Sequence, residues 1–530
     1  MARRNDISKI MVIGSGPIII GQACEFDYSG TQACKALKEE GYQVVLVNSN
    51  PATIMTDPQM ADSTYIEPLT PETLEKIIQK EKPDALLPNL GGQTGLNLSA
   101  TLSKMGILKK YNVELIGVNS DAIEKGEDRI SFKSTMEHLR IDMPRSCPTY
   151  SVGEAVEIAQ QLGYPVILRP AYTLGGTGGG IAYNVEELRT IVYRGLKASM
   201  IGQVLVEESV LGWEELELEV VRDKKGNKIT VCFIENVDPM GVHTGDSFCT
   251  APMLTVSQAL QERLQKMSYD VVDAIDVLGG CNIQFAHNPA DGRVVIIEIN
   301  PRTSRSSALA SKATGFPIAR ISAKLAVGIT LDELPYWKEG TLDKYKPGGD
   351  YVVVKFARWA FEKFPQAEDR LGTQMQAVGE VMSIGKNFKE AFQKAIRSLE
   401  IKRYGLGFAK NFHTLSLEVL RANLIYPTSE RVFIIYEALR KGMPVDEIYQ
   451  LTRINRWFLD QIQELVALEE EIIKSKGKKL SKTLLLNAKE NGFSDRCIAA
   501  LTGTSENTIR SQRLQADKKE HFEAVPVSGA

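Results

Sequence analysis

The sequence lacks a run of about 18 apolar residues, the least that a membrane-spanning helix needs, so we expect no membrane partner. The first six residues have no apolar segment after their two arginines, which argues against a secretory signal peptide. The seven cysteines form no C-x-x-C pair and show no metal-ligand spacing. They indicate reduced thiols, and we therefore expect a cytoplasmic protein. The net charge of −3 gives no bulk attraction to nucleic acid.

The chain of 530 residues is long enough for two to four domains, and its apolar content of 43% supports large cores. Strand and helix signals alternate along its first quarter, which predicts a parallel, doubly wound sheet. Strands are expected at 9–13, 43–47, 85–87 and 115–118, and helices at 31–40 and 71–81. The glycines at 14, 16 and 21 have the wrong spacing for an NAD site, and Asn48 ends the second strand where an acid is expected.

Residues 164–180 contain the most informative motif. An apolar strand at 166–168 ends in Arg169, and five of the six residues from 175 to 180 are glycine. Glycine lets backbone N–H groups approach an anion closely, and the arginine adds a charge-assisted hydrogen bond. The pattern predicts a phosphate-binding loop, although the Gly-Lys-Ser/Thr ending of a P-loop is absent. The alternative interpretation is a flexible surface loop.

A second motif combines a short apolar strand at 294–297 with Glu298 and Asn300, which alternation places on one face. An upstream strand at 281–285 contributes Gln284. Carboxylate and carboxamide oxygens are hard ligands that suit Mg²⁺ shared with nucleotide phosphates. The alternative is that these residues simply end two strands and satisfy local polar groups.

From about residue 401 strand signals largely vanish, and helical periodicity dominates, for example over 457–468. Residues 493–510 have the outline of helix, glycine turn and helix, which is also that of a DNA-binding helix-turn-helix. In that rival function, a nucleic-acid regulator, Arg510 and Arg513 would contact phosphates. The low net charge disfavours it, and we expect no nucleic-acid partner.

Three runs (14–30, 164–178 and 300–316) resemble the large subunit of carbamoyl phosphate synthetase, a member of the ATP-grasp superfamily. The resemblance is to its N-terminal, carboxyphosphate-forming half and covers roughly residues 5 to 512. It implies an α/β fold with a pre-ATP-grasp, Rossmann-like doubly wound sheet at 1–127 and ATP-grasp domains at 128–402. An all-α oligomerisation domain would follow at 403–530.

The resemblance also implies a reaction, in which ATP phosphorylates bicarbonate to carboxyphosphate and ammonia then gives carbamate, within arginine and pyrimidine biosynthesis. It implies Mg²⁺ or Mn²⁺, with K⁺ as a further candidate. The implied nucleotide residues are Arg129 and Arg169 for the triphosphate, Gly175 and Gly176 for backbone N–H groups, Glu208 and Val210 for adenine, Glu215 for ribose, and Gly241, Val242 and His243 for the nucleotide wall. The implied metal ligands are Gln284, Glu298 and Asn300, and Arg302 and Arg305 would face bicarbonate and carboxyphosphate.

No second glycine-rich loop and no second Glu-x-Asn strand follow residue 330, and no glutaminase nucleophile motif is present. We therefore expect one half of a large subunit, in a homo- or hetero-oligomer with a glutaminase small subunit and the carbamate-phosphorylating second half. A biotin carboxylase-like ligase is the alternative within the superfamily. His243 has no required acid–base role, because bicarbonate is already an anion.

Overall fold

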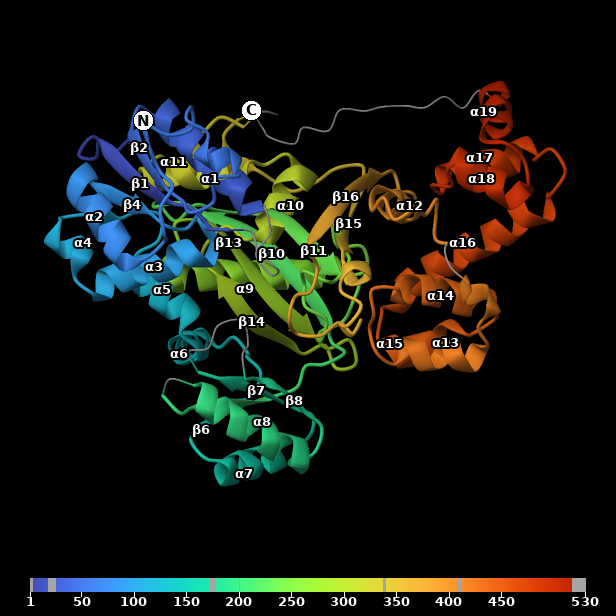
Figure 1. Ribbon diagram of the computed structural model, residues 1–530, viewed down its shortest axis with the longest axis horizontal. Coiled ribbons are helices and arrows are strands. Elements are labelled where there is room, and N and C mark those ends of the chain that lie inside the picture. The colour runs from blue at the N-terminus through green and yellow to red at the C-terminus, as the bar shows by residue number, and fades with distance from the viewer. Residues whose placement is uncertain are drawn as a thin grey trace.

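The computed structural model describes residues 3–17, 25–171, 178–199, 201–336, 340–407 and 411–516. Within these ranges the chain forms three β-sheets with flanking helices, followed by a group of helices at the C-terminal end (Figure 1). In this part of the chain no helix combines the length and the apolar character that crossing a membrane requires.

The first sheet is parallel and has the strand order β3-β2-β1-β4-β5. Its strands are β1 (Lys9–Ile13), β2 (Gln43–Val47), β3 (Ser63–Tyr65), β4 (Ala85–Leu87) and β5 (Glu114–Leu115). The helices α1 (Glu25–Glu39) and α11 (Ile318–Ala326) pack together on one face. The other face carries α2 (Pro71–Glu81), α3 (Gly92–Lys104) and α4 (Ile107–Lys110). The predicted doubly wound sheet is confirmed.

Two boundaries in this domain differ from the sequence prediction. The helix expected at 31–40 is α1, which already includes residue 25, so its start lies at least one and a half turns earlier than expected. The strand expected at 115–118 ends at Leu115, because the chain turns at Gly117, whose φ of +81° is not that of a strand. The other predicted elements of this region match the observed ones closely, and 71–81 matches to the residue.

The second sheet is antiparallel, with the order β14-β13-β10-β11-β12-β15-β16. Its strands are β10 (Glu214–Arg222), β11 (Lys228–Asn236), β12 (Cys249–Ala251), β13 (Gly279–His287), β14 (Val294–Asn300), β15 (Val352–Arg358) and β16 (Gly379–Gly385). One apolar cluster joins β10, β13 and β14 to α5 (Ser120–Glu127), α6 (Arg129–Leu139) and α9 (Gln258–Ile275). Another joins β11 and β12 to α10 (Arg305–Thr314) and α11.

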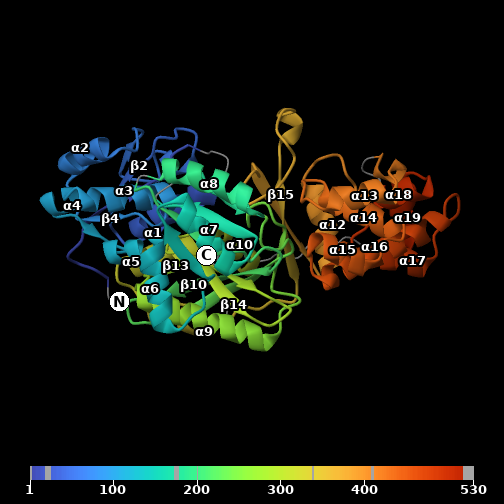
Figure 2. The same cartoon turned by 90° about the horizontal axis from the view of Figure 1, so that it is seen from below.

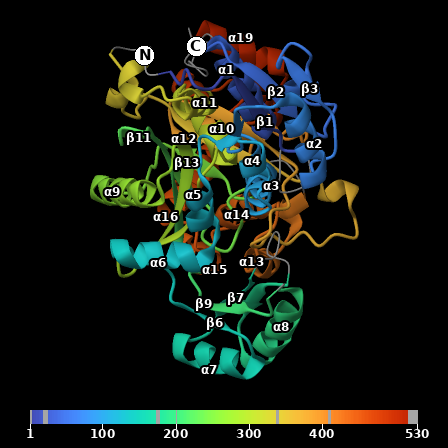
Figure 3. The same cartoon turned by 90° about the vertical axis from the view of Figure 1, so that its left-hand side faces the viewer.

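The third sheet belongs to a small lobe that projects from the rest of the molecule (Figure 3). Its order is β6-β9-β7-β8, with β6 (Ser146–Thr149), β7 (Val166–Pro170), β8 (Gly180–Ala182) and β9 (Val204–Glu208). The helices α7 (Val152–Leu162) and α8 (Val185–Ala198) cover it through an apolar cluster. Arg169 thus lies on β7, directly before the glycine-rich segment, as predicted.

The C-terminal helical region, residues 411–516, lies at one end of the molecule (Figure 2). It comprises α13 (Leu417–Leu424), α14 (Arg431–Arg440), α15 (Val445–Thr452), α16 (Arg456–Lys474), α17 (Lys482–Glu490), α18 (Asp495–Thr502) and α19 (Glu506–Gln515). The helix α12 (Phe388–Ser398) lies between this region and β15–β16 (Figure 1). The Phe388 ring is 5.2 Å from that of Phe458, so one apolar cluster continues from the second sheet into the helices.

Candidate active site

One face of the second sheet carries a row of buried carboxylates. Glu215, Glu217 and Glu219 alternate along β10 and therefore point to the same side, and each is at most 4% exposed. Of the three, only Glu215 has a role predicted from the sequence. Strand pairing sets Glu217 opposite Gln284 on β13, and Gln284 in turn lies opposite Glu298 on β14. The predicted metal ligands are thus neighbours across two adjacent strands.

Asn282, which is not among the predicted site residues, hydrogen-bonds two carboxylates of this charged face. Its Nδ2 lies 3.0 Å from Glu217 Oε2, 2.9 Å from Glu219 Oε1 and 3.0 Å from Ser306 Oγ. Burial raises the pKa of Glu219 to about 7 despite these bonds. Only the register of β13 against β10, which depends on long-range pairing, could have identified Asn282.

Glu215 carries a buried oxygen that the described residues do not satisfy. Its Oε2 is buried and has no hydrogen-bond partner in the described part of the chain. Burial and the nearby charges of Glu217 and Glu298 raise its pKa well above the ordinary value. A hydroxyl donor or a cation brought by a ligand would relieve this cost, which fits the predicted ribose contact.

The predicted metal ligands Glu298 and Asn300 are held loosely by their neighbours. Asn300 Nδ2 is 3.5 Å from Glu298 Oε1, and Asn300 Oδ1 accepts a hydrogen bond from Arg302 Nη2 at 3.0 Å. Each carboxylate and carboxamide oxygen keeps lone pairs free for a cation. The described residues contain no cluster of three or more His, Cys, Asp or Glu side chains that could hold a metal ion alone. This donor set fits a cation that shares its coordination with a bound phosphate.

The two predicted bicarbonate arginines come from adjoining segments after β14. Arg302 Nε donates to Gln93 Oε1 at 3.1 Å, and Gln93 Nε2 donates to Glu127 Oε2 at 2.8 Å. Helix α3 of the first domain therefore orients Arg302. Arg305 is the first residue of α10 and packs so closely on Gly245 that a Cβ there would lie 2.2 Å from its Nη1.

The two predicted triphosphate arginines meet on one carboxylate. Arg169 Nε donates to Glu207 Oε1 at 3.2 Å, and Arg129 Nη1 lies 3.8 Å from Glu207 Oε2. Their side chains are 33% and 39% exposed, so both can also reach a ligand. Gly175 and Gly176, the predicted backbone donors, lie outside the described residues.

An apolar wall, defined here as residues 210–213 and 238–243, adjoins the charged face. Its Val210, Trp213 and Met240 pack with residues of β13 and β14. The two segments are joined by Gly212 N–Met240 O at 3.0 Å and Met240 N–Trp213 O at 2.8 Å. Gly241 has a φ of +118°, and a Cβ there would lie 2.6 Å from Leu211 Cδ2, so the wall requires glycine at this position. The neighbouring Val242 is buried.

The side chain of Glu208 does not face this wall. Its carboxylate accepts hydrogen bonds from Arg145 Nε at 2.6 Å and from Arg293 Nη2 at 2.8 Å. Burial opposes ionisation, yet these bonds lower the pKa of Glu208 below its usual value. Any contact of Glu208 with adenine would therefore come from its backbone.

His243 is a neutral imidazole in this structure. Desolvation, then the charges of Arg305 and Lys355, lower its pKa to about 3. Its Nδ1 accepts a hydrogen bond from Gly245 N at 3.0 Å, which places the proton on Nε2. In this tautomer His243 can donate a hydrogen bond from Nε2, while Nδ1 is occupied by the Gly245 N–H.

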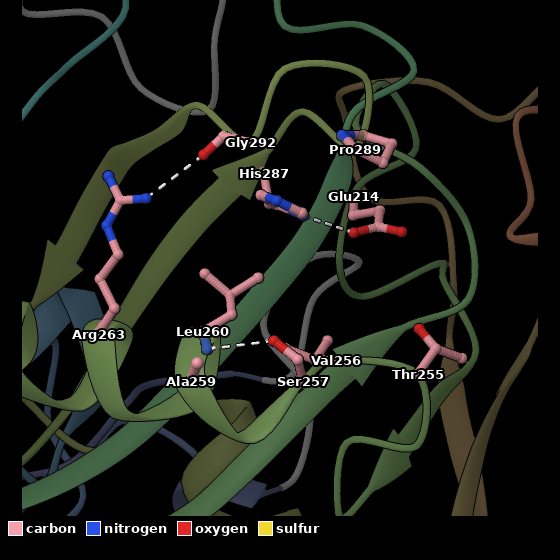
Figure 4. Close-up of a pocket in the computed structure, with 10 residues that line it drawn as sticks. All are labelled: Glu214, Thr255, Val256, Ser257, Ala259, Leu260, Arg263, His287, Pro289 and Gly292. Atoms are coloured by element: carbon pink, nitrogen blue, oxygen red, sulfur yellow. Dashed lines mark hydrogen bonds and ion pairs between the residues drawn. The ribbon is translucent and has the colours of Figure 1, made fainter.

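A cavity of about 520 Å³ lies beside the wall, at the N-terminal end of α9 (Figure 4). Glu214 and His287 point toward each other across its edge, with the carboxylate Oε2 2.7 Å from His287 Nδ1. Glu214 precedes Glu215 on β10 and so points away from the charged face. None of the residues that line this cavity is a predicted site residue.

The C-terminal helix pair has the predicted turn, and it buries one of the two arginines that the rival DNA-binding function would use. Gly503, with φ +72°, separates α18 from α19. Arg513 is 3% exposed and donates from Nε to Asp495 Oδ2 at 3.0 Å, so it cannot reach a phosphate backbone. Arg510 is exposed. The interpretation of Arg513 as a DNA contact is wrong, because the helices bury it against α18.

Family models divide the chain into three matched parts. The carbamoyl phosphate synthase preATP-grasp domain matches residues 6–125, and the L chain ATP binding domain matches residues 128–334. The large chain oligomerisation domain matches residues 380–517, which include the α18–α19 pair.

Among solved structures, the biotin carboxylase domain of Hydrogenobacter thermophilus 2-oxoglutarate carboxylase, in complex with MgADP, ADP and bicarbonate, has a TM-score of 0.57. It shares 16% identity, over 86% of this chain and 98% of that one. Campylobacter jejuni biotin carboxylase, a β,γ-ATP complex, also has a TM-score of 0.57 and 16% identity, over 84% of this chain and 99% of its own. These likenesses show the shared fold.

Curated sequence relatives share a much higher identity with this chain than these two solved structures do. The carbamoyl phosphate synthase large chain of Archaeoglobus fulgidus is 58% identical over 97% of this chain and 48% of its own length, so the chain spans about half of that relative. The Aquifex aeolicus protein described as the large chain's N-terminal section is 55% identical over 99% of this chain and 94% of its own length. The chain belongs to the carbamoyl phosphate synthase large chain family and corresponds to its N-terminal section.

Proposed function

We propose that this chain is an ATP-grasp ligase that makes carboxyphosphate and then carbamate. A bicarbonate oxygen attacks the γ-phosphorus of ATP, the bond from that phosphorus to the β,γ-bridging oxygen breaks, and ADP leaves. The nitrogen of ammonia then attacks the carboxyl carbon of carboxyphosphate, inorganic phosphate leaves, and a proton is lost to give carbamate. Both steps need positioning and charge neutralisation more than covalent help from the protein.

The observation that carries the proposal is the continuous set of polar contacts from Arg302 through Asn300 to Glu298, opposite Gln284. An arginine fork suited to bicarbonate therefore lies next to oxygens suited to a phosphate-bound cation. The Oε2 atom of Glu215, which is buried and has no hydrogen-bond partner in the described part of the chain, supports a ligand on the same face. Membership of the large chain family supports the same reaction.

In this proposal each predicted residue keeps its role. Mg²⁺ would be held by Gln284, Glu298 and Asn300 and would neutralise charge on the transferred phosphoryl group. Mn²⁺ and K⁺ are further candidates that a metal titration would compare. The ATP contacts we propose are Arg129, Arg169, Gly175, Gly176, Glu215, Gly241, Val242 and His243, with the backbone of Glu208 and the side chain of Val210 at adenine. Arg302 and Arg305 would hold bicarbonate and carboxyphosphate.

We propose domain limits of 1–127, 128–402 and 403–530. The helical domain would mediate oligomerisation in the cytoplasm, within arginine and pyrimidine biosynthesis. A glutaminase small subunit would supply ammonia, and the second half of the large subunit would phosphorylate carbamate. A chain with this single reaction centre should form carbamoyl phosphate from glutamine only after both partners are added.

The test is ATP hydrolysis by the purified chain with and without bicarbonate. We expect bicarbonate to stimulate ADP release severalfold, with no effect of biotin. Stimulation that required biotin would support a biotin carboxylase-like ligase instead. Absence of any bicarbonate effect at saturating ATP and Mg²⁺ would contradict the proposed function.

A further inference from the structure

Two helix starts of the helical region donate hydrogen bonds at the apolar wall, one to its residue Asp238 and one to Glu214, the residue directly after its first segment. We propose that Arg431 and Asn455 are positioning residues, through which the helical region fixes the wall against which the adenine end of ATP binds. The inference rests on the proposed function, because it assigns these residues to the same ATP site. It gives the helical region a role in nucleotide binding besides association.

Arg431, the first residue of α14, holds the start of the wall's second segment. Its Nε donates to Asp238 Oδ1 at 2.6 Å, its Nη2 also bonds Asp238 Oδ2, and Nη2 reaches Asp246 O at 3.3 Å. The two charged side chains are only 4% and 2% exposed. The guanidinium also lies 4.6 Å from the centre of the Phe248 ring. A planar fork bound at both carboxylate oxygens fixes the direction of residue 238 and hence of the segment up to His243.

A second connection runs through the segment before β16. Leu371 N donates to Pro427 O at 2.8 Å, and Ser429 N donates to Asp369 Oδ1 at 2.8 Å. The adjoining Gly372 O accepts a hydrogen bond from His243 N at 2.7 Å. Residues 427–429, which end two positions before Arg431, thus hold the other end of the same wall segment.

Asn455, the N-cap of α16, bonds Glu214, the residue directly after the first wall segment. Its Nδ2 donates to Glu214 Oε1 at 2.9 Å and lies 3.2 Å from Thr255 Oγ1. Figure 4 shows Glu214 bound on its other oxygen by His287. The next residue, Glu215, points into the charged face, so fixing Glu214 also fixes the backbone that presents Glu215.

The neighbouring Arg453 strengthens this contact by packing. Arg453 is the C-cap of α15, and a Cβ on Gly212 would lie 3.1 Å from its Cγ, so this end of α15 packs tightly on the wall. Both wall segments are hydrogen-bonded to each other through Gly212 and Met240. A displacement at either helix contact should therefore move the whole wall.

The test compares nucleotide affinity in three full-length variants. Asn455→Ala removes one contact while His287 continues to hold Glu214, and we expect ADP to bind about threefold to fivefold more weakly, as one lost hydrogen bond implies. Arg431→Lys keeps the charge but loses the fork, and we expect about tenfold weaker binding. Arg456→Met removes an exposed ion pair with Asp446 in the same region and should leave ADP affinity unchanged.

Calorimetric titration with MgADP gives the affinities, and steady-state assays give the KM for ATP and for bicarbonate. Positioning predicts a raised KM for ATP with the KM for bicarbonate unchanged, whereas a general loss of folded protein would lower kcat alone. ADP affinities of Asn455→Ala and Arg431→Lys within twofold of the unmodified chain would overturn the inference. If Arg431→Lys fails to fold, Asn455→Ala decides alone. An unmodified chain that binds no ADP would instead contradict the proposed function, and this inference with it.

Discussion

The charged face of the second sheet and the helical region bury opposite kinds of side chain. On β10 the buried side chains include three carboxylates, and Glu215 and Glu219 have raised pKa values because burial disfavours their charge. In residues 411–516 the buried side chains are mainly Leu, Ile, Val and Phe, in one cluster that continues to β15 and α12. Buried carboxylates cost free energy in the absence of a ligand, whereas apolar burial stabilises the fold. The carboxylates of β10 are therefore the part that a proposed ligand would relieve, and the apolar helices are the part that stabilises the fold.

Glu298→Gln should reduce activity more than any other substitution considered, and it changes only the charged face. The variant keeps shape but removes the negative charge proposed to hold the cation. We expect bicarbonate-dependent ATP hydrolysis to fall about a thousandfold, since charge neutralisation of the phosphoryl group is lost. Phosphate release at saturating MgATP measures it. Glu418→Gln, at an exposed position of α13, is the control and should retain full activity. Normal turnover in Glu298→Gln would contradict the metal assignment.

Arg302→Met should cause the next largest loss of activity, and the loss should appear in the use of bicarbonate and not in the use of ATP. Loss of a charge-assisted fork should reduce kcat/KM for bicarbonate about a hundredfold, while the KM for ATP changes little. Arg302→Lys keeps the charge and should recover only part of the loss, because a single ammonium cannot replace the fork. Equal changes in the KM for ATP and the KM for bicarbonate would show that Arg302 stabilises the structure of the whole site and does not bind bicarbonate specifically.

Gly241→Val tests the apolar wall, which lies beside the charged face and is bonded to the helical region through Asp238. A Cβ at this position meets Leu211, and the φ of +118° is strained for valine, so we expect MgADP to bind roughly tenfold more weakly. Gly226→Val is the matched control. It also has a positive φ, but its Cβ would point into open space far from the wall. Equal ADP affinity in both variants would argue against a nucleotide role for residue 241.

The sequence predicted the charged face better than it predicted the wall. Short-range patterns sufficed for Glu298 and Asn300, because strand alternation fixes which side chains share a face. The contact between Arg431 and Asp238 spans 193 residues, and no local pattern contains it. The ion pairs of Glu208 with Arg145 and Arg293 likewise depend on packing between separate segments. The roles of Gly175 and Gly176 stay predictions, since they lie outside the described residues.

Glu469→Gln should leave catalysis unchanged and should alter only the free energy of unfolding. Burial of its side chain raises the pKa of Glu469, on α16, from the ordinary value of 4.5 to about 7. The folded chain therefore retains a proton that the unfolded chain loses, and the free energy of unfolding falls as pH rises from about 4.5 to 7. Glutamine removes this penalty, so the variant should gain up to about 3 kcal/mol at pH 8 and little at pH 4.5.

Denaturant unfolding at several pH values measures this difference. Glu471→Gln, on an exposed position of the same helix, should follow the unmodified chain at every pH. A pH-independent difference between the Glu469→Gln variant and the unmodified chain would contradict the assigned titration.

The central claim, that bicarbonate attacks the γ-phosphoryl group of ATP, is tested most directly by isotope transfer. The purified chain is incubated with MgATP and ¹⁸O-labelled bicarbonate, and the released phosphate is analysed by mass spectrometry. Attack by a bicarbonate oxygen followed by cleavage at the carboxyl carbon leaves that oxygen on phosphorus. The account predicts one ¹⁸O atom in each phosphate released by the bicarbonate-dependent reaction. Phosphate whose fourth oxygen comes only from solvent water would contradict it.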